Sequence, residues 1–509
     1  MDVSASVRLR AVKSALDGGV VPAHAARHGD GAAVVASTLP GRTPLDVRLG
    51  LTKPADVTFP LRWGILGAAN ICADWVRALT NVPGASVVAV AARSADSAAS
   101  FAAEWSIPRS YEGYDKLAAD PDVDIVYCGT ITPLHKEHVL MCIAAGKHVL
   151  VEKPMSMSKE ESEEMYAAAA MAGVMMQEGM WSRFFPATEH ARALIEAGAI
   201  GEVTNLQADF GFSGMGQSAE DMAAKRAIHN PSMSCYIAQT APLAFGSTDV
   251  IKVVASGVMP DGYSICTSGG ATIEFGNEAK NVAGLTWTME AKLREHAVII
   301  GKTGRLILEP AHAPTTLTVI SDQGKDGYPG AYHGIYIPVD ETVIKYNNLD
   351  PGTTGTSDAS GYNFPNSSGF TYQAEAVHRC LASGVLECPQ YTKAESLCVT
   401  RILDGIQSAL EAQPPASPAP TPVFDGQLPR MPTAALPTGV TDPSTPMDIK
   451  MGLTVAEDVA HPLRWGFMTA GRICADMAQA CLIAADRGCG ATLGAVAARK
   501  VEDAEAFGE

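Results

Sequence analysis

Residues 61–93 read LRWGILGAANICADWVRALTNVPGASVVAVAAR, and this stretch decides the fold. It begins with a short apolar run, Leu61–Leu66, and continues into a tight turn that Gly67 opens. Apolar residues then recur at helical spacing over Ile71–Thr80, and Ser86–Ala92 is a β-branched run typical of a buried parallel strand. The order strand, turn, helix and strand predicts a βαβ unit whose turn presents backbone N–H groups to a phosphate.

The glycines of this turn form only part of the fingerprint that dinucleotide-binding folds share. Gly64 and Gly67 are followed by Ala69, where the full pattern has a third glycine. The stretch alone therefore leaves two interpretations open, a nucleotide-binding βαβ unit and a βαβ unit without a nucleotide.

Length and composition limit the number of domains and the classes of partner that the chain can have. A chain of 509 residues exceeds what one core holds, so we expect two or more domains. The net charge of −17 argues against a nucleic-acid or anionic-membrane partner, and no apolar run approaches the roughly 20 residues that cross a bilayer. The 11 cysteines show no CxxC pair and no zinc spacing, which predicts reduced core thiols and no metal site. We expect a cytoplasmic protein, with an organelle transit peptide left open by the first 30 residues.

From residue 61 onward, strands and helices alternate, which predicts a doubly wound parallel sheet with its ligand site at the carboxyl ends of the strands. Further strands are predicted at Asp124–Gly129, His148–Val151 and Val174–Gln177, and helices at Lys136–Ala145 and Lys159–Ala172. After about residue 185 the strands follow one another through short Gly-, Asn- and Asp-bearing connections, before helices at Glu375–Leu381 and Ser396–Leu410. The predicted fold class is therefore α/β plus α+β: a Rossmann-like doubly wound parallel sheet followed by a large open, mostly antiparallel sheet.

The start of the first domain occurs twice. Residues 60–64, PLRWG, recur as residues 462–466, and ICAD at 71–74 recurs at 473–476, which indicates a tandem duplication. The second copy stops after its second strand, and its turn, Met468–Gly471, lacks the counterpart of Gly67, so we do not expect it to bind a nucleotide. Such a fragment implies either a longer parent chain or a segment that packs poorly or on a partner.

These observations predict five regions. They are an N-terminal extension (1–59) with a helix near Val7–Leu16, a nucleotide-binding domain (60–184), an open-sheet domain (185–412), a proline-rich linker (413–447) and the truncated second copy (448–509).

Two motifs carry chemistry at predicted strand ends. Val151-Glu152-Lys153-Pro154 follows a buried strand, where a ligand would lie, although a surface salt bridge is the alternative. The second motif, EGMWSRFFP at residues 178–186, lies at the passage between the two domains. For Phe184 and Phe185 we favour a place in the core between the domains.

With these motifs in hand, residues 61–412 resemble the glucose–fructose oxidoreductase / inositol dehydrogenase (Gfo/Idh/MocA) family. The matching stretches include RWGILGAANI, TITPLHKEH, AAGKHVLVEKP, EGMWSRFFPA, GKTGRLILEP and FTYQAEAVHRCL. Within the family, the most similar branch is that of the dimeric dihydrodiol dehydrogenases and NADP-dependent D-xylose dehydrogenases. The resemblance implies a Rossmann domain, an open antiparallel sheet and a homodimer formed through that sheet.

The resemblance also implies roles for individual residues. The turn Gly67, Ala68, Ala69, Asn70 and Ile71 would hold the pyrophosphate, and the other cofactor-binding residues would be Arg93, Thr130, Pro133, His135, Glu152, Lys153, Trp181 and Arg183. Arg93 stands where an acidic residue would grip the NAD ribose, so an arginine there favours NADP, with NAD as the other possibility. Lys153 and Tyr236 would be catalytic, and Trp181, Phe210, Tyr236 and Phe364 would line the substrate pocket.

The implied reaction is the oxidation of a secondary alcohol of a cyclic trans-diol or an aldose by hydride transfer to NADP⁺. Tyr236 would take the hydroxyl proton, and because a free tyrosine titrates near pH 10, Lys153 would have to favour the phenolate. The chain departs from the family pattern at Ser232, at residues 227–230, at Ser234 and at His312, which replaces a tryptophan. A weakly active or inactive NADP(H)-binding tandem-repeat protein is therefore an alternative, and a lyase-type reaction is a third.

Overall fold

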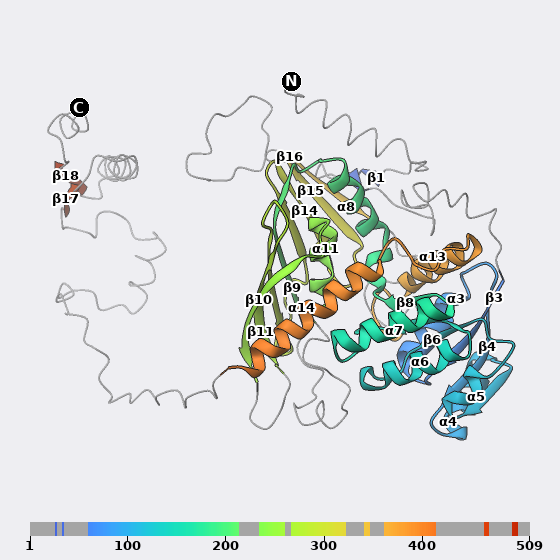
Figure 1. Cartoon of the computed structure of the whole chain (residues 1–509). Helices are drawn as coiled ribbons and strands as arrows, with labels where there is room; N and C mark the ends of the chain where they lie inside the picture. Colours follow the sequence, from blue (N-terminus) through green and yellow to red (C-terminus); the bar gives the residue numbers. More distant parts are fainter. Residues whose placement is uncertain are drawn as a thin grey trace, which may run out of the picture. The chain divides into compact units, whose positions relative to one another are not determined.

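The computed structural model describes residues 60–212, 234–259, 266–321, 340–346 and 361–413, together with short strands at 26–27, 33–34, 463–467 and 491–496. The chain divides into two units, residues 1–415 and 416–509. The first unit contains a six-stranded sheet and an eight-stranded sheet (Figure 1).

The six-stranded sheet is parallel throughout, in the order β5-β4-β3-β6-β7-β8. Its strands are β3 (Leu61–Leu66), β4 (Ala85–Ala92), β5 (Arg109–Glu112), β6 (Ile125–Cys128), β7 (His148–Glu152) and β8 (Met176–Gly179). The connecting helices are α3 (Asn70–Leu79), α4 (Ala95–Trp105), α5 (Tyr114–Ala118), the 3₁₀ turn η2 (Thr132–Leu134), α6 (His135–Ala144) and α7 (Lys159–Ala172). A second 3₁₀ turn, η3 (Trp181–Phe184), leads out of the sheet.

Each face of the parallel sheet packs into its own core. On one face Trp63 of β3 meets Trp75 of α3 with ring centroids 5.3 Å apart, and Trp75 stacks on Tyr127 of β6 at 4.6 Å. On the other face Leu66 packs into the core that includes Leu117 of α5 and residues of α6 and α7. Such buried aromatic pairs contribute about 0.5–1.5 kcal/mol beyond their burial, so α3 and its glycine turn are held firmly on the sheet.

The eight-stranded sheet has the order β10-β11-β12-β9-β13-β14-β15-β16. Its strands are β9 (Val203–Gly211), β10 (Val250–Val258), β11 (Ser268–Phe275), β12 (Val282–Thr288), β13 (Ala297–Gly301), β14 (Gly304–Glu309), β15 (Thr316–Ser321) and β16 (Asp340–Lys345). Every neighbouring pair is antiparallel except β12 and β9, which are parallel. The predicted fold class, α/β plus α+β, is confirmed.

The helices described after β8 are α8 (Pro186–Glu196), α10 (Cys235–Ala238), α11 (Thr240–Phe245), α13 (Phe370–Ala382), preceded by the 3₁₀ turn η6 (Ser367–Gly369), and α14 (Lys393–Glu411). Most of these helices pack against strands of the second sheet, whereas α13 packs against α3 beside the first sheet (Figure 1). Helix α14 begins with a capping box formed by Thr392 and Glu395, and it packs against both β10 and α7 (Figure 1). Its Gly405 permits the close approach, because a Cβ there would lie 2.8 Å from the Cβ of Val253.

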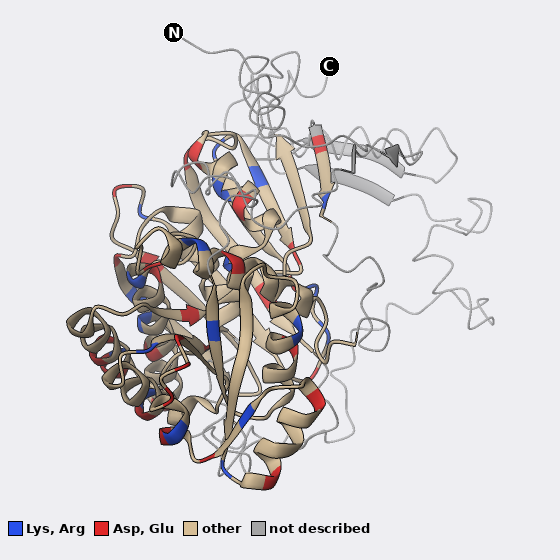
Figure 2. Cartoon of the chain, turned by 90° about the vertical axis from the view of Figure 1, so that its right-hand side faces the viewer, with Lys and Arg blue, Asp and Glu red and all other residues tan. Residues whose placement is uncertain are grey.

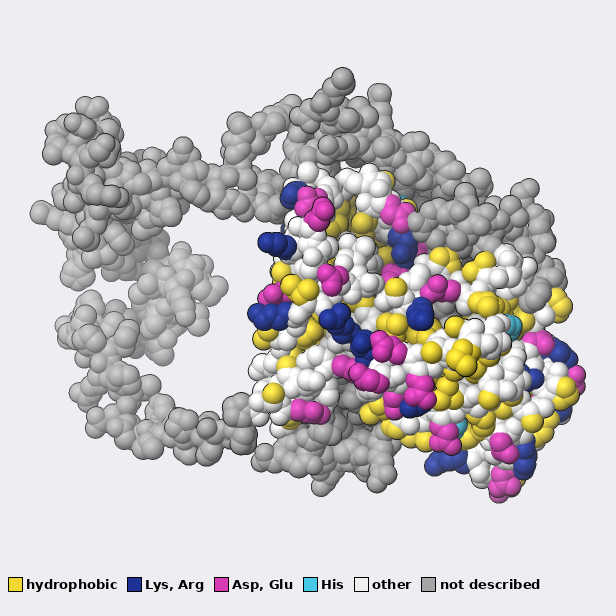
Figure 3. All heavy atoms as spheres, in the orientation of Figure 1, with side chains coloured by type: hydrophobic (Ala, Val, Ile, Leu, Met, Phe, Trp, Pro, Cys, Tyr) yellow, Lys and Arg dark blue, Asp and Glu magenta, His cyan; other side chains and the backbone are white. Residues whose placement is uncertain are grey.

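Acidic and basic residues are interspersed over the outer helices and strand ends of the described residues (Figure 2). In the space-filling view, charged side chains of both signs also alternate with apolar ones (Figure 3). Among the described residues, no helix combines the length and the apolar character that crossing a membrane requires.

Short paired strands are also described in the N-terminal and C-terminal regions. In the first unit β1 (Ala26–Arg27) pairs with β2 (Ala33–Val34). In the second unit β17 (Leu463–Phe467) pairs in parallel with β18 (Ala491–Val496), and the register is irregular between Trp465 and Gly466. The pair β3–β4 has the same irregularity between Trp63 and Gly64, so the repeated sequence forms the same strand pairing in both copies.

Several predicted features lie outside the described residues. They are the helix near Val7–Leu16, the linker after residue 413, Ser232 and the altered segment 227–230. The domain boundaries at 59, 184, 412 and 447 stay predictions.

Candidate active site

The glycine turn forms a cradle at the start of α3. Gly67 has a φ of +112°, and a Cβ there would lie 3.1 Å from the carbonyl oxygen of Gly129, so only glycine fits. Ala69 caps α3 without a side-chain hydrogen bond, the first turn holds no acidic residue, and Ala69 and Asn70 are exposed. The N-termini of α4, α7 and α14, by contrast, are each capped by a Ser or Thr side chain. The turn therefore fits a pyrophosphate, which the free N–H groups and the helix dipole would bind.

Arg93 lies directly after β4 at the same edge of the sheet. It is exposed, and it makes no ion pair within the described part of the chain. Desolvation raises the pKa of the nearby Tyr114, and the charge of Arg93 acts in the opposite direction. The Tyr114 ring packs on His138 at 4.4 Å, and His138 Nδ1 lies 3.0 Å from Thr130 Oγ1. The geometry thus aligns Arg93 and Thr130, two predicted cofactor residues, along one edge.

His135 faces inward and contacts two loops, and its predicted place beside the cofactor stays a prediction. Its Nδ1 lies 3.0 Å from the Pro154 carbonyl oxygen and its Nε2 lies 2.9 Å from the Thr130 carbonyl oxygen. Desolvation lowers the pKa of this buried imidazole to about 4. His135 therefore joins the loop after β6 to the loop after β7, whereas its neighbour Pro133 is exposed on η2.

Lys153 and Tyr236 come together from different parts of the fold. Lys153 follows β7, Tyr236 lies on α10, and Lys153 Nζ is 4.4 Å from the centroid of the Tyr236 ring. Desolvation disfavours the charged lysine, but Tyr236, Cys235 and Glu152 outweigh it and raise the pKa of Lys153. Desolvation raises the pKa of Tyr236 to about 12, although the Lys153 charge opposes it. At neutral pH the pair therefore consists of an ammonium and a protonated phenol; the Lys153 charge favours the phenolate, as the sequence led us to expect, but does not outweigh desolvation.

Glu152 is buried behind this pair. Its Oε1 accepts a hydrogen bond from Tyr127 Oη at 2.8 Å, and its Oε2 accepts one from the Lys153 backbone N–H at 3.2 Å. Desolvation raises the pKa of Glu152. These contacts make Glu152 a support for the Lys153 loop, and its predicted contact with the cofactor stays a prediction.

Aromatic rings form a wall on the open-sheet side of the pair. Phe210, near the end of β9, lies 5.4 Å from the Tyr236 ring and 5.1 Å from the His312 ring, and Tyr236 and His312 lie 5.9 Å apart. The structure thus brings Phe210 and Tyr236 together as predicted, and it adds His312. His312 was not among the predicted site residues. Its position just after the strand that ends at Glu309 could have indicated that it lies near the site.

Trp181 and Phe364 lie in different surroundings. Trp181 is buried against Phe370 at 4.6 Å and Phe185 at 5.5 Å, and its Nε1 has no hydrogen-bond partner among the described residues. Phe364 is 41% exposed, and its backbone N–H donates to Asp74 of α3 at 3.0 Å. No ring contact joins either residue to Tyr236 or Phe210 within the described part of the chain, and the predicted four-residue substrate pocket stays a prediction.

Arg183 is fully buried and links elements. Its Nη1 donates to the Gln239 carbonyl oxygen at 2.9 Å, and its Nη2 forms an ion pair with Glu395. Gln239 directly follows α10, so Arg183 holds the helix that carries Tyr236 against the start of α14. These contacts give Arg183 a part in positioning α10, and its predicted role in binding the cofactor stays a prediction.

Comparison with known proteins agrees with this geometry. Residues 61–180 match the family described as "Oxidoreductase family, NAD-binding Rossmann fold" (GFO_IDH_MocA). A trans-1,2-dihydrobenzene-1,2-diol dehydrogenase from Xenopus tropicalis is 32% identical over 353 residues, which span 67% of this chain and 96% of that protein. The enzyme of that name from Mus musculus is 31% identical over 354 residues, 69% of this chain and 97% of that protein.

Solved structures share the fold at lower identity. An NAD-binding oxidoreductase from Klebsiella pneumoniae superposes with a TM-score of 0.56 at 18% identity and covers 69% of this chain and 97% of its own. A 3-ketoreductase from Actinomadura kijaniata, solved with NADP and TDP-benzene, gives a TM-score of 0.54 at 22% identity and covers 69% and 98%. A levoglucosan dehydrogenase, solved with NADH and levoglucosan, gives a TM-score of 0.56 at 19% identity, with coverage of 69% and 97%.

Proposed function

This chain belongs to the Gfo/Idh/MocA oxidoreductase family, and on that basis we propose that it is an NADP-dependent dehydrogenase that oxidises a secondary alcohol of a cyclic trans-diol or an aldose. The observation that carries the proposal is the contact between Lys153 Nζ and the Tyr236 ring, 4.4 Å from its centroid, beside Phe210. The relatives named as dihydrodiol dehydrogenases support a diol as substrate.

In the proposed mechanism, Tyr236 accepts the hydroxyl proton during oxidation and returns it during reduction. A nicotinamide cofactor held by the Gly67 turn and Arg93 would supply the acceptor for the hydride of the carbinol carbon. The Lys153 ammonium, 4.4 Å from the ring centroid, stabilises the phenolate that forms on Tyr236, and Glu152 holds the Lys153 backbone. Positioned acid–base groups of this kind contribute roughly 10²–10⁴ in rate.

The direct test is to incubate the full-length protein with NADP⁺ or NAD⁺ and a panel of cyclic trans-diols and aldoses, and to follow absorbance at 340 nm. We expect turnover with at least one diol or sugar. NADPH binding without turnover of any substrate would contradict the proposal and favour the weakly active or inactive alternative.

The pH dependence of the reaction follows from the raised pKa of Tyr236, about 12. Oxidation needs the deprotonated phenol, so kcat/KM for the alcohol at saturating NADP⁺ should rise about tenfold per pH unit between pH 7 and pH 9. Reduction of the corresponding ketone uses the protonated phenol and should stay constant over the same range. Initial rates in both directions measure this, with Tyr236→Phe as the control that loses the rise. A flat profile for oxidation would contradict the role of Tyr236.

The preference for NADP is assigned to Arg93, whose exposed guanidinium follows β4. Replacing Arg93 by alanine should raise KM for NADP⁺ roughly 10- to 100-fold, because a charge-assisted hydrogen bond to the 2′-phosphate contributes about 1.5–3 kcal/mol. KM for NAD⁺ should stay within about twofold, since that ribose carries no phosphate. Arg401→Ala, on the exposed side of α14, serves as the control. An equal change for both cofactors would contradict the assignment.

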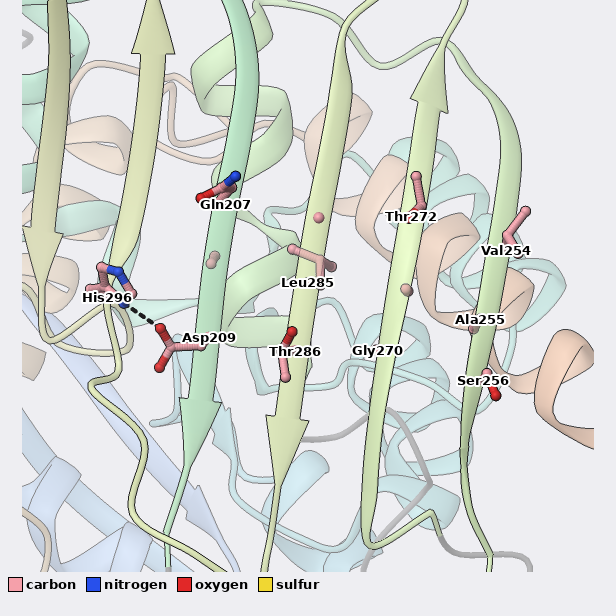
Figure 4. A pocket seen from close by; sticks show the side chains of 13 residues that line it. Gln207, Asp209, Val254, Ala255, Ser256, Gly270, Thr272, Leu285, Thr286 and His296 are labelled. Atoms are coloured by element: carbon pink, nitrogen blue, oxygen red, sulfur yellow. Dashed lines mark ion pairs between the residues drawn. The ribbon is translucent and has the colours of Figure 1, made fainter. Parts of the chain in front are cut away.

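We also propose a homodimer formed through the outer face of the open sheet. This face carries a hollow of about 600 Å³ lined by small and polar residues of β9 to β12, including Gln207, Thr272 and Thr286 (Figure 4). The hollow lies opposite the substrate side, because Asp209, which lines it, alternates along β9 with the inward-facing Phe210. Sedimentation equilibrium would test this, and a monomeric mass would contradict it.

A further inference from the structure

Behind the aromatic wall, Glu295 is held in place by backbone hydrogen bonds on both sides. Its N–H donates to Asp209 Oδ1 at 2.7 Å, and its carbonyl oxygen accepts from the Ala311 N–H at 2.7 Å. Glu295 has a φ of +60°, a conformation that a non-glycine residue adopts only when its surroundings impose it. Strand β9 and the turn after β14 thus fix one buried carboxylate between them.

The Glu295 carboxylate faces a single histidine nitrogen. Its Oε2 forms an ion pair with Lys292 Nζ at 2.5 Å and lies 3.7 Å from His312 Nδ1. This distance is too long for a hydrogen bond, and Nδ1 has no hydrogen-bond partner among the described residues. The negative charge of the carboxylate nevertheless favours the tautomer of a neutral His312 that carries its proton on Nδ1. The other nitrogen, Nε2, is then left with a lone pair and acts as an acceptor.

His312 is neutral at physiological pH. Desolvation and the charges of Lys292 and Lys153 lower the pKa of His312 to about 4. Since Lys153 acts on His312, the imidazole lies within electrostatic reach of the proposed acid–base pair. Its ring also contacts Phe210 and Tyr236, with centroids 5.1 and 5.9 Å away. The neutral imidazole of His312 therefore places a hydrogen-bond acceptor among the aromatic rings of Phe210 and Tyr236.

The turn that carries His312 is also tied to the cofactor side of the site. The Asn366 side chain donates to the Ala313 carbonyl oxygen at 3.5 Å. Asn363, three residues earlier, donates through its backbone and side chain to Asp74 of α3, at 2.7 and 2.8 Å. His312 is thereby held at a set position relative to both Tyr236 and the glycine turn of α3.

We propose that His312 determines substrate specificity, because its Nε2 accepts a hydrogen bond from the hydroxyl next to the one that is oxidised. The inference rests on the proposed function and adds to it the requirement for a vicinal hydroxyl. A diol or a sugar satisfies the buried acceptor, whereas a monohydroxy alcohol leaves it unpaired. The site therefore selects polyhydroxy substrates over simple secondary alcohols.

The test compares trans-cyclohexane-1,2-diol with cyclohexanol for the wild type and for three variants at His312. His312→Phe keeps a ring against Phe210 and Tyr236 but has no acceptor, and His312→Gln and His312→Met have similar lengths but differ in the acceptor. We expect the ratio of kcat/KM values, diol over cyclohexanol, to fall about tenfold or more in the Phe and Met variants. The Gln variant should retain most of the ratio.

His296→Gln provides the matched control, because His296 pairs with Asp209 beside the outer hollow of the sheet (Figure 4). This variant should leave the ratio unchanged. A ratio that survives in both the Phe and the Met variants overturns the role of His312 while leaving the proposed function intact. Absence of turnover with either alcohol in the wild type overturns both.

Discussion

Replacing Lys153 by alanine is expected to lower kcat for the diol by roughly 10²–10⁴, with KM for NADP⁺ changed by no more than a few-fold. The reason is the position of the ammonium, 4.4 Å from the centre of the Tyr236 ring. Without this charge, the desolvation that already raises the pKa of Tyr236 is no longer opposed, and the phenolate needed for oxidation becomes scarcer still. Steady-state kinetics with saturating cofactor measure the effect.

The control for this variant is Lys302→Ala, a surface lysine whose ion pair with Glu202 lies on the open sheet. It should leave kcat within about twofold of the wild type, because exposed ion pairs contribute little. Wild-type kcat in the Lys153 variant would refute the scheme in which Lys153 and Tyr236 act together. A tenfold higher KM for NADP⁺ with an unchanged kcat would instead make Lys153 a cofactor-binding residue.

Replacing Gly67 by alanine is expected to weaken NADPH binding at least tenfold and to destabilise the fold by about 1–2 kcal/mol. At a φ of +112° any side chain is strained, and the new Cβ would lie 3.1 Å from the Gly129 oxygen and 3.2 Å from Cys72 Sγ. Relieving these contacts moves the turn that precedes α3, and with it the N–H groups that would bind the pyrophosphate. Fluorescence titration with NADPH and thermal unfolding measure the two effects.

Gly146→Ala is the control that separates backbone strain at a positive φ from the steric contacts of a new Cβ. Gly146 has a φ of +74°, but a Cβ there meets nothing within 4 Å. This variant should lose a similar amount of stability while binding NADPH as the wild type does. If the two alanine variants bind NADPH equally well, the Gly67 turn is not the phosphate site.

The sequence predicts the parallel sheet well because its local signals are strong. Helix α7 starts and stops where predicted, at Lys159 and Ala172, because Ser158 caps one end and Gly173 ends the other in the left-handed conformation. Strand β8 was placed two residues too early, at Val174–Gln177 instead of Met176–Gly179. The strand contains Gln177 and continues through Glu178, a buried carboxylate that hydrophobic patterning does not predict.

Distant partners explain why those polar residues are buried. Gln177 accepts a hydrogen bond from the Cys388 N–H, and Glu178 accepts one from the Ser396 hydroxyl. Both partners lie more than 200 positions along the chain, so no local pattern reveals them. Strand β5, Arg109–Glu112, was missed for a related reason, since it is a short edge strand of mostly polar residues.

The sequence predicted those site residues that belong to recognisable motifs. It did not predict the contacts of residues whose partners are brought together only by the packing of the fold. Lys153, Tyr236 and Phe210 meet as expected from the motifs. Arg183 is held by Glu395, a partner that the sequence does not single out, so burial gave it a role in positioning α10. His312 was noted only as a departure from the family pattern, and its place in the site followed once the fold brought its ring against Phe210 of β9 and Tyr236 of α10.

The residues on the two sides of the contact between Lys153 and Tyr236 come from different sheets. Gly67, Arg93 and Lys153 all lie at the edge of the parallel sheet, whereas Tyr236, Phe210 and His312 lie on the open-sheet side. Under the proposed function, Gly67 and Arg93 would recognise the dinucleotide and Phe210 and His312 the alcohol, so the two specificities could change independently of each other. A lineage that altered only Phe210 or His312 would then acquire a new substrate while keeping its coenzyme.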